Sequence, residues 1–486
     1  MAKKTIRGFP GLQALCAFVQ GFRALLVPCG PGITVSPVFG SSRCQSMSRN
    51  NHNKGNRSRG PEPPSPDVID ASDIVDSIDG EPSLRVISRL QRNGFEAYLV
   101  GGCVRDLLVG LTPKDFDVAT SAHPRQVRRL FPRNSHVIGR RFRLVHVRYG
   151  SQSVIETATF RAAPQETSGE DDLLIVEDNT YGTAAEDAMR RDFTVNGMLL
   201  DPYRRQIIDH VGGLRDLEDG VLRTIGNPFI RIPEDPVRIL RAIKFATRLG
   251  LRIEEDTWEA MCDGAEDLSR SAPPRVTEEI LRLMRSGTAL GAFNKMRHCG
   301  VLGVVLPDLD EFLGEVEGAD RIHEKRVSNF RALLEALDSS VHDGVDVSTA
   351  SCLALLFHDI VEVEANPSTR TQRGKPGDFH TVAGEVLEDM ASNARLSRRD
   401  VGRARRIIYQ QRIFTAPFGR RFRPALFCLS EEFPESLDLF RLRCEAEGEG
   451  WDLYKAWEER YESAITLDDD EVESERRQAR RRRRRK

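Results

Sequence analysis

Two glycines and two carboxylates stand close together in the first third of this chain. Gly101 and Gly102 follow a short apolar run, residues 97–100, which predicts a buried strand, and a helix is expected from about Val104. Glycines between a strand and a helix let a phosphate approach backbone N–H groups. A second strand, predicted over residues 114–118, carries Asp115 and Asp117. Because side chains alternate along a strand, both carboxylates are expected on one face.

This pattern predicts the chemistry of nucleotidyl transfer. Neighbouring carboxylates repel each other by roughly 4 kcal/mol at about 4 Å if the effective dielectric is near 20. A pair of Mg²⁺ ions beside a phosphate-binding turn would offset that repulsion. Each half of the pattern is weak by itself, since a Gly-Gly pair is often a simple turn and a D-x-D a solvated strand edge. Their adjacency, with Arg105 between them, favours the catalytic interpretation.

The order G-G-x-V-R-D-x-L-x-G, then D-x-D, resembles the opening motif of the class II nucleotidyltransferases of the polymerase-β superfamily. That group contains the CCA-adding enzymes of tRNA and the bacterial-type poly(A) polymerases. The resemblance runs from about residue 84 to about residue 286, with weaker similarity beyond. It implies an α+β protein, in which a polymerase-β-like head with a mixed β-sheet and helices is followed by an all-α neck and body.

Composition, periodicity and the resemblance together divide the chain into five parts. Residues 1–80 are expected to be a disordered basic extension and linker, and residues 81–222 the nucleotidyltransferase catalytic head. A helical neck over 223–290 is expected to select the base and bind nucleotide and RNA, and a helical body over 291–465 to bind RNA. Residues 466–486 form an acidic, then Arg- and Lys-rich tail that is expected to be disordered. The formal net charge of −2 hides these local basic surfaces.

The resemblance implies roles for further residues of the head. Glu156, on a strand expected next to that of Asp115 and Asp117, stands where the superfamily has a third catalytic carboxylate. An exposed Glu paired with a basic side chain is the alternative. Asp115 and Asp117 are the expected ligands of the two Mg²⁺ ions. The expected nucleotide-binding residues of the head, of which Asp192 and Asn196 would handle the ribose, are Gly101, Gly102, Arg105, Arg161, Arg191, Asp192 and Asn196.

Residues 234–245 resemble a third signature of the family. Asp235 and Arg238 are three residues apart, which would place them on one helix face, with Pro236 in the first turn. The family uses such a pair to read the edge of the incoming base. The alternative is an ion pair within the helix. Arg241 and Lys244 continue the basic face and are expected to bind RNA.

Two features favour polyadenylation among the activities of the family. Residues 137–146 resemble a stretch typical of bacterial poly(A) polymerases, and Arg140, Arg141 and Arg143 within it are expected to bind RNA. The basic run 476–486 would hold phosphates without reading sequence. The expected function is template-independent addition of AMP from ATP to RNA 3′ ends in RNA turnover, by a two-metal mechanism. A CCA-adding tRNA nucleotidyltransferase is the alternative, and an inactive RNA-binding regulatory homologue a second one.

The expected partners are RNA 3′ ends, ATP as substrate and RNA-decay proteins. No membrane partner is expected, because the apolar stretch 12–27 is interrupted by Gln20 and Arg23. Nine cysteines without a C-x-x-C pair suit a reducing compartment. A bacterial-type cytoplasm is expected, with an organelle as the alternative if residues 1–46 are a transit peptide rather than a disordered extension or an upstream start before Met47.

Four residues of the body resemble the metal ligands of a degenerate metal-dependent phosphohydrolase domain of the HD type. They are His323, His358, Asp359 and His380. The Gly-Lys that usually follows His-Asp is replaced by Ile-Val at 360–361. Packed or surface histidines without a metal are therefore expected.

Overall fold

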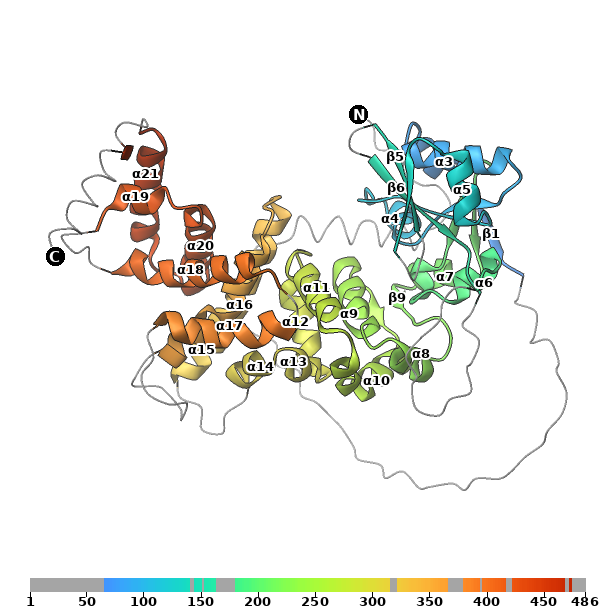
Figure 1. Ribbon diagram of the computed structural model, residues 1–486. Coiled ribbons are helices and arrows are strands. Elements are labelled where there is room, and N and C mark those ends of the chain that lie inside the picture. Colours follow the sequence, from blue (N-terminus) through green and yellow to red (C-terminus); the bar gives the residue numbers. More distant parts are fainter. Residues whose placement is uncertain are drawn as a thin grey trace, which may run out of the picture. The chain divides into compact units, whose positions relative to one another are not determined.

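A computed structural model describes residues 65–139, 144–150, 153–162, 180–314, 321–365, 379–393, 396–416, 422–467 and 472–473. The chain divides into two compact units, with the division after Val221. Each unit has its own secondary structure and core (Figure 1). The division lies one residue before the end of the head expected from the sequence.

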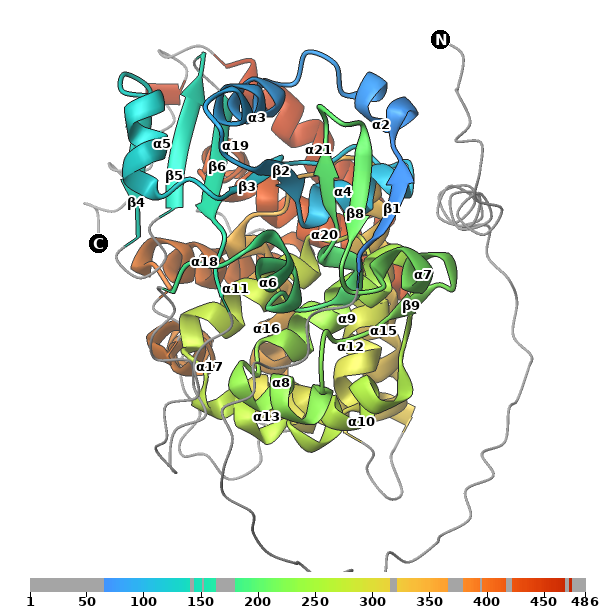
Figure 2. The ribbon, with the colours of Figure 1, turned by 90° about the vertical axis from the view of Figure 1, so that its right-hand side faces the viewer.

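An eight-stranded mixed sheet forms the centre of the first unit (Figure 2). Its strands are β1 (Asp67–Asp70), β2 (Ala97–Val100), β3 (Asp117–Thr120), β4 (Ser135–Ile138), β5 (Leu144–Tyr149), β6 (Ser153–Thr159), β7 (Leu199–Asp201) and β8 (Gln206–Asp209). Their order is β1-β8-β7-β2-β3-β6-β5-β4. Strands β3 and β6 are parallel, and every other neighbouring pair is antiparallel.

Short helices accompany this sheet. They are α2 (Ser72–Ser77), α3 (Pro82–Arg92), α4 (Gly102–Leu108), α5 (Pro124–Leu130), α6 (Ala184–Met189), the 3₁₀ helix η1 (Thr194–Asn196) and α7 (Gly213–Glu218). Helix α3 packs against β2, β3 and β6, and α5 packs against β4 and β5. Val86, Ile87 and Leu90 of α3 are fully buried, as a stripe of helical spacing predicts.

Strand β2 lies in the middle of the sheet, which explains its wholly apolar sequence. All four of its residues are buried, and Tyr98 and Val100 join a core cluster with Ala119, Phe160 and Leu199. Its position between β3 and β7 brings the turn at its end, Gly101, next to the start of β3. The sheet therefore places the glycines and the carboxylates of the sequence motif side by side.

The head begins earlier in the chain than expected. Residues up to 80 were expected to be extension and linker, but β1 pairs with β8 in register, Val68 opposite Ile208. Ala71 and Ile74 just after β1 are buried. The sequence Asp-Val-Ile-Asp is too short and too acidic for a strand signal, and β8 supplies the hydrogen bonds that make it one. The expectation for residues 1–64 lies outside the described residues.

The second unit is helical in the part of the chain that the structure describes, apart from a two-stranded ribbon of β9 (Val221–Leu222), where the units divide, and β10 (Arg252–Ile253). Its first helices are α8 (Pro228–Glu234), α9 (Arg238–Leu249), α10 (Glu255–Asp263), η2 (Glu266–Arg270), α11 (Pro273–Met284), α12 (Ala289–His298), α13 (Val301–Val305) and α14 (Pro307–Leu313). The later ones are α15 (Arg321–His342), α16 (Thr349–Ala365), α17 (Phe379–Asn393), α18 (Arg398–Thr415), α19 (Pro424–Cys428), α20 (Phe433–Glu447) and α21 (Trp451–Ile465).

Aromatic side chains hold the last helices of this unit together. Phe414, Phe433 and Trp457 are buried in one cluster, and Trp457 Nε1 donates a hydrogen bond to the carbonyl of Phe414 at 3.1 Å. Helix α20 also packs against α15, α16 and α18. Of the helices that the structure describes, none combines the length and the apolar character needed to cross a membrane.

Candidate active site

The turn after β2 brings a guanidinium against the backbone. Gly101 has φ +77°, a conformation that side chains rarely adopt, and a Cβ there would lie 3.1 Å from Arg191 Nη1. Gly102 begins α4, two residues before the helix start expected from the sequence. Both the backbone conformation and the neighbouring Arg191 therefore require glycine at position 101. A guanidinium in this place can bind phosphate oxygens of a ligand that reaches the turn.

The carboxylates gather at the start of β3. Asp117 is its first residue and is paired with Val100. The sequence predicted that Asp115 also lies on this strand, but Asp115 precedes it. On the neighbouring strand β6, Glu156 immediately precedes Thr157, the partner of Val118. Glu156 is therefore on the strand next to that of Asp117, as expected. The three carboxylates therefore lie on, or two residues before, two adjacent inner strands of the sheet.

These carboxylates perturb one another. Loss of hydration and the charges of Glu156 and Asp115 together raise the pKa of Asp117 to about 6, against the lowering effect of Arg191. Repulsion of this kind indicates that the positive charge of Arg191 does not neutralise the cluster. Burial likewise raises the pKa of the neighbouring Cys103 thiol to about 12, so Cys103 is an inert packed residue.

The donor set of these three carboxylates fits a divalent cation. Carboxylate oxygens are the ligands that Mg²⁺ prefers, and an added cation would relieve the repulsion around Asp117. No group of three or more His, Cys, Asp or Glu side chains in the described ranges is already close enough to hold a metal ion. Asp115 and Asp117 are the residues that would hold such an ion, with Glu156 beside them.

Asp187, which the sequence analysis did not select, fixes two of the arginines. Its Oδ2 accepts a hydrogen bond from Arg191 Nη2 at 3.0 Å, and its Oδ1 accepts one from the backbone N–H of Arg161 at 3.2 Å. Asp187 is buried, and its spacing of four residues from Arg191 is the signal that could have identified it. It orients Arg191 toward Gly101.

Arg105 is buried behind the glycine turn. Its side chain is only 2% exposed, and its Nε and Nη2 donate to Asp106 Oδ1 at 2.9 and 2.6 Å. Its Nη1 donates to Asn196 Oδ1, and Asn196 Nδ2 in turn donates to Asp192 Oδ1 at 3.1 Å. Arg105 therefore positions Asn196 and, through it, Asp192. That Arg105 itself contacts the nucleotide stays a prediction.

His146 is a second residue that sequence reasoning missed. It lies opposite Glu156 in the register of β5 and β6, and its Nε2 is 3.1 Å from Glu156 Oε1. The alternation of β5 could have indicated that His146 shares a face with Glu156. The expected RNA-binding residues Arg140, Arg141 and Arg143, which precede β5, lie outside the described residues.

The expected base-reading pair belongs to the second unit and is not on one helix. Asp235 ends α8, Pro236 and Val237 form a turn, and Arg238 is the first residue of α9. The proline disfavours a helical Asp235, which explains the break. Asp235 Oδ2 accepts from Arg275 Nη2 at 2.9 Å. The two residues therefore share a turn rather than a helical face, so that part of the prediction is wrong.

Arg238 is largely buried between other groups of the neck. It donates to the carbonyl of Arg231 and lies 3.3 Å from Glu234 Oε2. Loss of hydration, together with the charge of Arg231, lowers the pKa of Arg238. Asp235 and Arg238 therefore do not form the ion pair that was the alternative interpretation of the motif. Asp235 pairs with Arg275, and Arg238 pairs with Glu234.

Lys244 is paired with an acidic side chain of the neck, and its assignment to RNA binding stays a prediction. Its Nζ lies 2.5 Å from Glu279 Oε2, and its side chain is only 13% exposed. Burial lowers the pKa of Lys244, and the Glu279 carboxylate opposes that effect. Arg241 is more exposed, lies 3.8 Å from Glu279 and stacks over Phe245. Of the two, Arg241 has the better access to a ligand.

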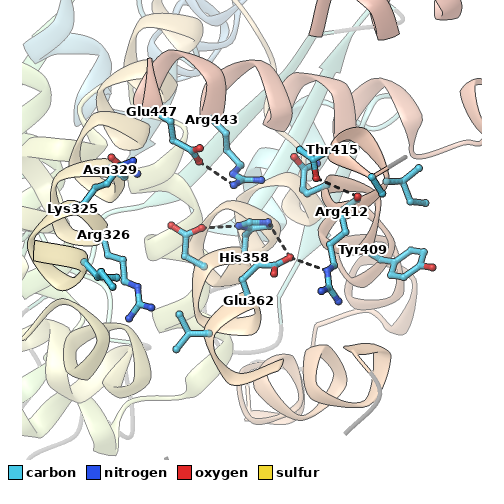
Figure 3. A pocket seen from close by; sticks show the side chains of 16 residues that line it. Lys325, Arg326, Asn329, His358, Glu362, Tyr409, Arg412, Thr415, Arg443 and Glu447 are labelled. Carbon is cyan, nitrogen blue, oxygen red and sulfur yellow. Dashed lines mark hydrogen bonds and ion pairs between the residues drawn. The ribbon is translucent and has the colours of Figure 1, made fainter. Parts of the chain in front are cut away.

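The histidines of the body do not form a metal cluster in the part of the chain that is described. His323 Nε2 contacts the carbonyl of Gly314 at 2.8 Å, and His380 lies outside the described side chains. His358 is buried with Nδ1 2.7 Å from Asp359 Oδ1 (Figure 3). Burial would raise the pKa of Asp359, but His358, Arg443 and Arg326 hold it below its usual value. Asp359 is therefore an ionised acceptor.

Three family models match the chain. The Poly A polymerase head domain matches residues 97–223, the probable RNA and SrmB-binding site of polymerase A matches 250–313, and the polymerase A arginine-rich C-terminus matches 375–486. The first contains the glycine turn, the three carboxylates and Arg191. The second and third lie within the second unit and the tail.

Known relatives cover the chain to different extents. The chain is 35% identical to Poly(A) polymerase I of Haemophilus influenzae over 78% of its own length and 83% of that protein. It is 40% identical to the CCA-adding enzyme of Oceanobacillus iheyensis, but over only 42% of its own length and 50% of that protein. The solved structure of the Bacillus stearothermophilus CCA-adding enzyme with CTP has a similar fold, with a TM-score of 0.56 at 24% identity, over 78% of this chain and 81% of that one.

The fold, the carboxylates of β3 and β6 and the matching family models define a nucleotidyltransferase that binds RNA. Enzymes of this class use a nucleotide as substrate and generally need a divalent metal ion. Within that class, the chain belongs to the poly(A) polymerase family that also includes the CCA-adding enzymes.

Proposed function

We propose that this protein adds AMP from ATP to the 3′ ends of RNA without a template. The observation that carries the proposal is the extent of its similarity. Similarity to a poly(A) polymerase extends over 78% of the chain, whereas similarity to a CCA-adding enzyme extends over 42%. The arginine-rich C-terminal model also matches residues 375–486. A bacterial-type cytoplasm is the expected compartment, and RNA-decay proteins are expected partners.

Asp115, Asp117 and Glu156 would carry the chemistry. Two Mg²⁺ ions, when bound, would activate the RNA 3′-hydroxyl and stabilise the departing pyrophosphate. Asp115 and Asp117 supply the ligand oxygens, and Glu156 supports them from the adjacent strand. His146 holds Glu156 in place from β5. Because Asp117, Glu156 and His146 lie on neighbouring strands of one sheet, their spacing is set by the register of β3, β5 and β6.

The nucleotide would be held by groups around the glycine turn. Arg191 binds phosphate oxygens beside Gly101 and Gly102, and Asp187 fixes its orientation. Asp192 and Asn196 face the ribose, with Arg105 behind them. The backbone N–H of Arg161 donates to the same Asp187, which supports the proposal that Arg161 also binds the phosphates.

Asp235 and Arg238 would read the base from the neck. The carboxylate of Asp235 accepts from the exocyclic amine of adenine, and Arg238 donates to a ring nitrogen. Asp235 is partly exposed and its partner Arg275 is more so, hence Asp235 can exchange that partner for a base. Arg238 is held rigidly by Glu234, so its direction is preset.

Addition of C, C and A to tRNA is the second candidate, because 42% of the chain matches a CCA-adding enzyme at 40% identity. Single-nucleotide incorporation separates the two. Purified protein with Mg²⁺ and an unstructured RNA is given ATP, CTP, GTP or UTP separately. The proposal predicts that ATP is incorporated at least tenfold faster than CTP. Use of CTP confined to a tRNA without its CCA end, given in a parallel reaction, would favour the second candidate. No incorporation into either RNA would favour an inactive RNA-binding homologue.

A further inference from the structure

We propose that the helical body contains a binding site for one ribonucleotide unit of single-stranded RNA, in a pocket between α15, α16, α18 and α20. The inference rests on the proposed function in that it takes RNA as the polymer bound. It adds a defined subsite, built on His358, that the family comparisons do not assign. The pocket, its unsatisfied polar atoms, its charges and its aromatic wall carry the inference.

The pocket has a volume of about 900 Å³ and lies entirely within the second unit (Figure 3). Lys325 and Arg326 come from α15, His358 and Glu362 from α16, Arg412 from α18 and Arg443 from α20. This volume is in the upper range of ligand-binding pockets. It is large enough for a nucleotide and the chain that continues from it.

Three buried polar atoms in the pocket wall have no hydrogen-bond partner. They are His358 Nε2, Gln411 Oε1 and Arg443 Nε. The His358 and Gln411 side chains are almost fully buried, at 2% and 1% exposure. Buried polar atoms are nearly always paired, so three in one wall point to a ligand that supplies the partners. Two of the three are acceptors and one is a donor.

The direction of the hydrogen bonds follows from the neighbours. Asp359 is ionised and can only accept, so His358 Nδ1 donates to it, and in that tautomer Nε2 is an acceptor. Gln411 Nε2 donates to the carbonyl of Ser436 at 2.9 Å, which leaves Oε1 as the second acceptor. A ligand for this wall must therefore present hydroxyl or amine donors.

Glu362 controls access to His358. Its Oε1 lies 4.0 Å from His358 Nε2, too far for a hydrogen bond, and 3.6 Å from Arg412 Nε. The Glu362 side chain is 34% exposed, and Figure 3 shows it between His358 and Arg412. Rotation of this exposed carboxylate opens Nε2 to a ligand without a change in the helices.

The charges of the pocket leave one cation for a ligand. Basic and acidic side chains that line it are Lys325, Arg326, Arg412 and Arg443, and Asp359, Glu362 and Glu447. Each of these carboxylates already has a partner: His358 for Asp359, Arg412 for Glu362 and Arg443 for Glu447. The Nη2 of Arg443 is 3.0 Å from Glu447. Arg326 forms no hydrogen bond or ion pair with any described residue. Lys325 has a partner outside the pocket, Glu449 at 3.9 Å, so Arg326 is the cation that can take a phosphodiester group.

Apolar walls complete the site. Tyr409 is 37% exposed and lines the pocket together with Ile322, Val363 and Ile413. A basic groove with an exposed aromatic ring is the usual way to hold single-stranded nucleic acid, because bases stack on the ring. A ribonucleotide supplies each required group: a base for Tyr409, a phosphodiester for Arg326, and a 2′-hydroxyl for His358. A deoxynucleotide lacks the last of these.

The test measures binding of labelled oligoadenylate by fluorescence anisotropy with the full-length protein and no ATP. Ribo- and deoxyribo-oligomers of the same length are compared. Arg326→Ala is expected to weaken RNA binding about three- to tenfold and to lower the slope of log affinity against log salt by roughly 0.7. The matched control is Arg331→Ala on the same helix, outside the pocket, which should change neither.

His358→Phe tests the hydroxyl contact. It should weaken binding of the RNA oligomer about two- to tenfold and leave the DNA oligomer unchanged, because only RNA loses a hydrogen bond. His358→Gln, which keeps an acceptor, should retain part of the preference and serves if the Phe variant does not fold. Equal loss for RNA and DNA, or no loss in either His358 variant or in Arg326→Ala, overturns the proposal.

Two further outcomes are distinguishable. If adenosine monophosphate binds wild type but not Arg326→Ala while RNA affinity is unchanged, the pocket is a site for free nucleotide and the RNA proposal is overturned. ATP incorporation into RNA is measured on the same samples. A wild type that binds RNA as described but does not extend it contradicts the proposed function alone. Normal extension with unaltered RNA binding in the variants contradicts the pocket alone.

Discussion

Arg191 lies directly against the backbone of Gly101, with Nη1 3.1 Å from the position that a Cβ would occupy. The glycine turn and Arg191, ninety residues apart in sequence, therefore meet on one surface, which is the proposed phosphate site. Arg191 also lowers the pKa of Asp117, so its charge acts on the carboxylates that we propose hold the metal ions. In the proposed function, one residue thus connects the nucleotide phosphates to these carboxylates.

Gly101→Ala should abolish activity for two reasons. The left-handed φ costs about 1–2 kcal/mol for a side chain, and the new Cβ displaces Arg191. We expect kcat/KM for ATP to fall about a hundredfold or more. Gly94→Ala is the matched control, because Gly94 has φ +81° but nothing within 4 Å of its Cβ. It should cost similar stability and retain activity. Equal activity losses in the two variants would contradict the role of Arg191 at the turn.

Asp187→Asn should raise KM for ATP about tenfold with a small effect on kcat. The amide cannot hold the Arg191 guanidinium as a carboxylate does, so phosphate binding suffers while the carboxylates stay in place. Steady-state kinetics check this split. Asp219→Asn is the control: it removes the carboxylate of an exposed ion pair with Arg215, four residues earlier, and should change neither kcat nor KM. A fall in kcat alone would show that Asp187 acts elsewhere.

Asp117→Asn should remove activity and stabilise the metal-free protein. The folded-state pKa of about 6 lies above the ordinary 3.8, so folding opposes ionisation of Asp117. The free energy of unfolding of wild type therefore decreases as the pH rises from about 4 through about 6. The variant lacks this decrease, so its melting temperature should exceed that of wild type at pH 7 and approach it at pH 4. Melting curves in a chelator check this, and a gap independent of pH would contradict it.

Asp235→Asn should relax base selection with little change in stability. The Asp235–Arg275 pair is exposed, so its loss costs within about 1 kcal/mol. We expect the preference for ATP over GTP to fall about tenfold or more, because the acceptor for the exocyclic amine is lost. Competition assays with both nucleotides measure this. Asp267→Asn, in another exposed pair with Arg270, is the control. Unchanged selection would remove Asp235 from the base-reading role.

Lys244→Met should destabilise the protein without a change in the salt dependence of RNA binding. Loss of the ammonium leaves the buried Glu279 with weaker partners, at a cost of about 1–3 kcal/mol. Denaturant unfolding measures the cost, and a salt titration of RNA binding tests the second part. Lys295→Met, at the end of α12, is the surface control. A reduced salt slope in Lys244→Met would restore Lys244 as an RNA contact.

Local patterns predicted much of the head. The wholly apolar residues 97–100, the helical stripe of Leu84, Ile87 and Leu90 and the strand predicted around Glu156 correspond to β2, α3 and β6. Strand β1 escaped prediction because it becomes a strand only through its pairing with β8. A four-residue acidic segment carries no local signal of a distant partner.

The site was predicted by residue type better than by contact. Asp117 and Glu156 lie on adjacent strands as expected, but sequence does not show which arginine is buried. Arg105 and Lys244 are both largely buried and have acidic partners, Asp106 and Glu279, which the sequence did not indicate. The turn at Pro236 could be inferred from the restriction on Asp235, although the motif suggested a continuous helix.

The most direct test of the central claim is the length of the products made on two RNAs. Purified protein with Mg²⁺ receives an unstructured RNA or a tRNA without its CCA end, and ATP alone or ATP with CTP. The account predicts long ATP-dependent tails on the unstructured RNA, with no requirement for CTP. Addition of only two C residues and one A, confined to the tRNA, would contradict it.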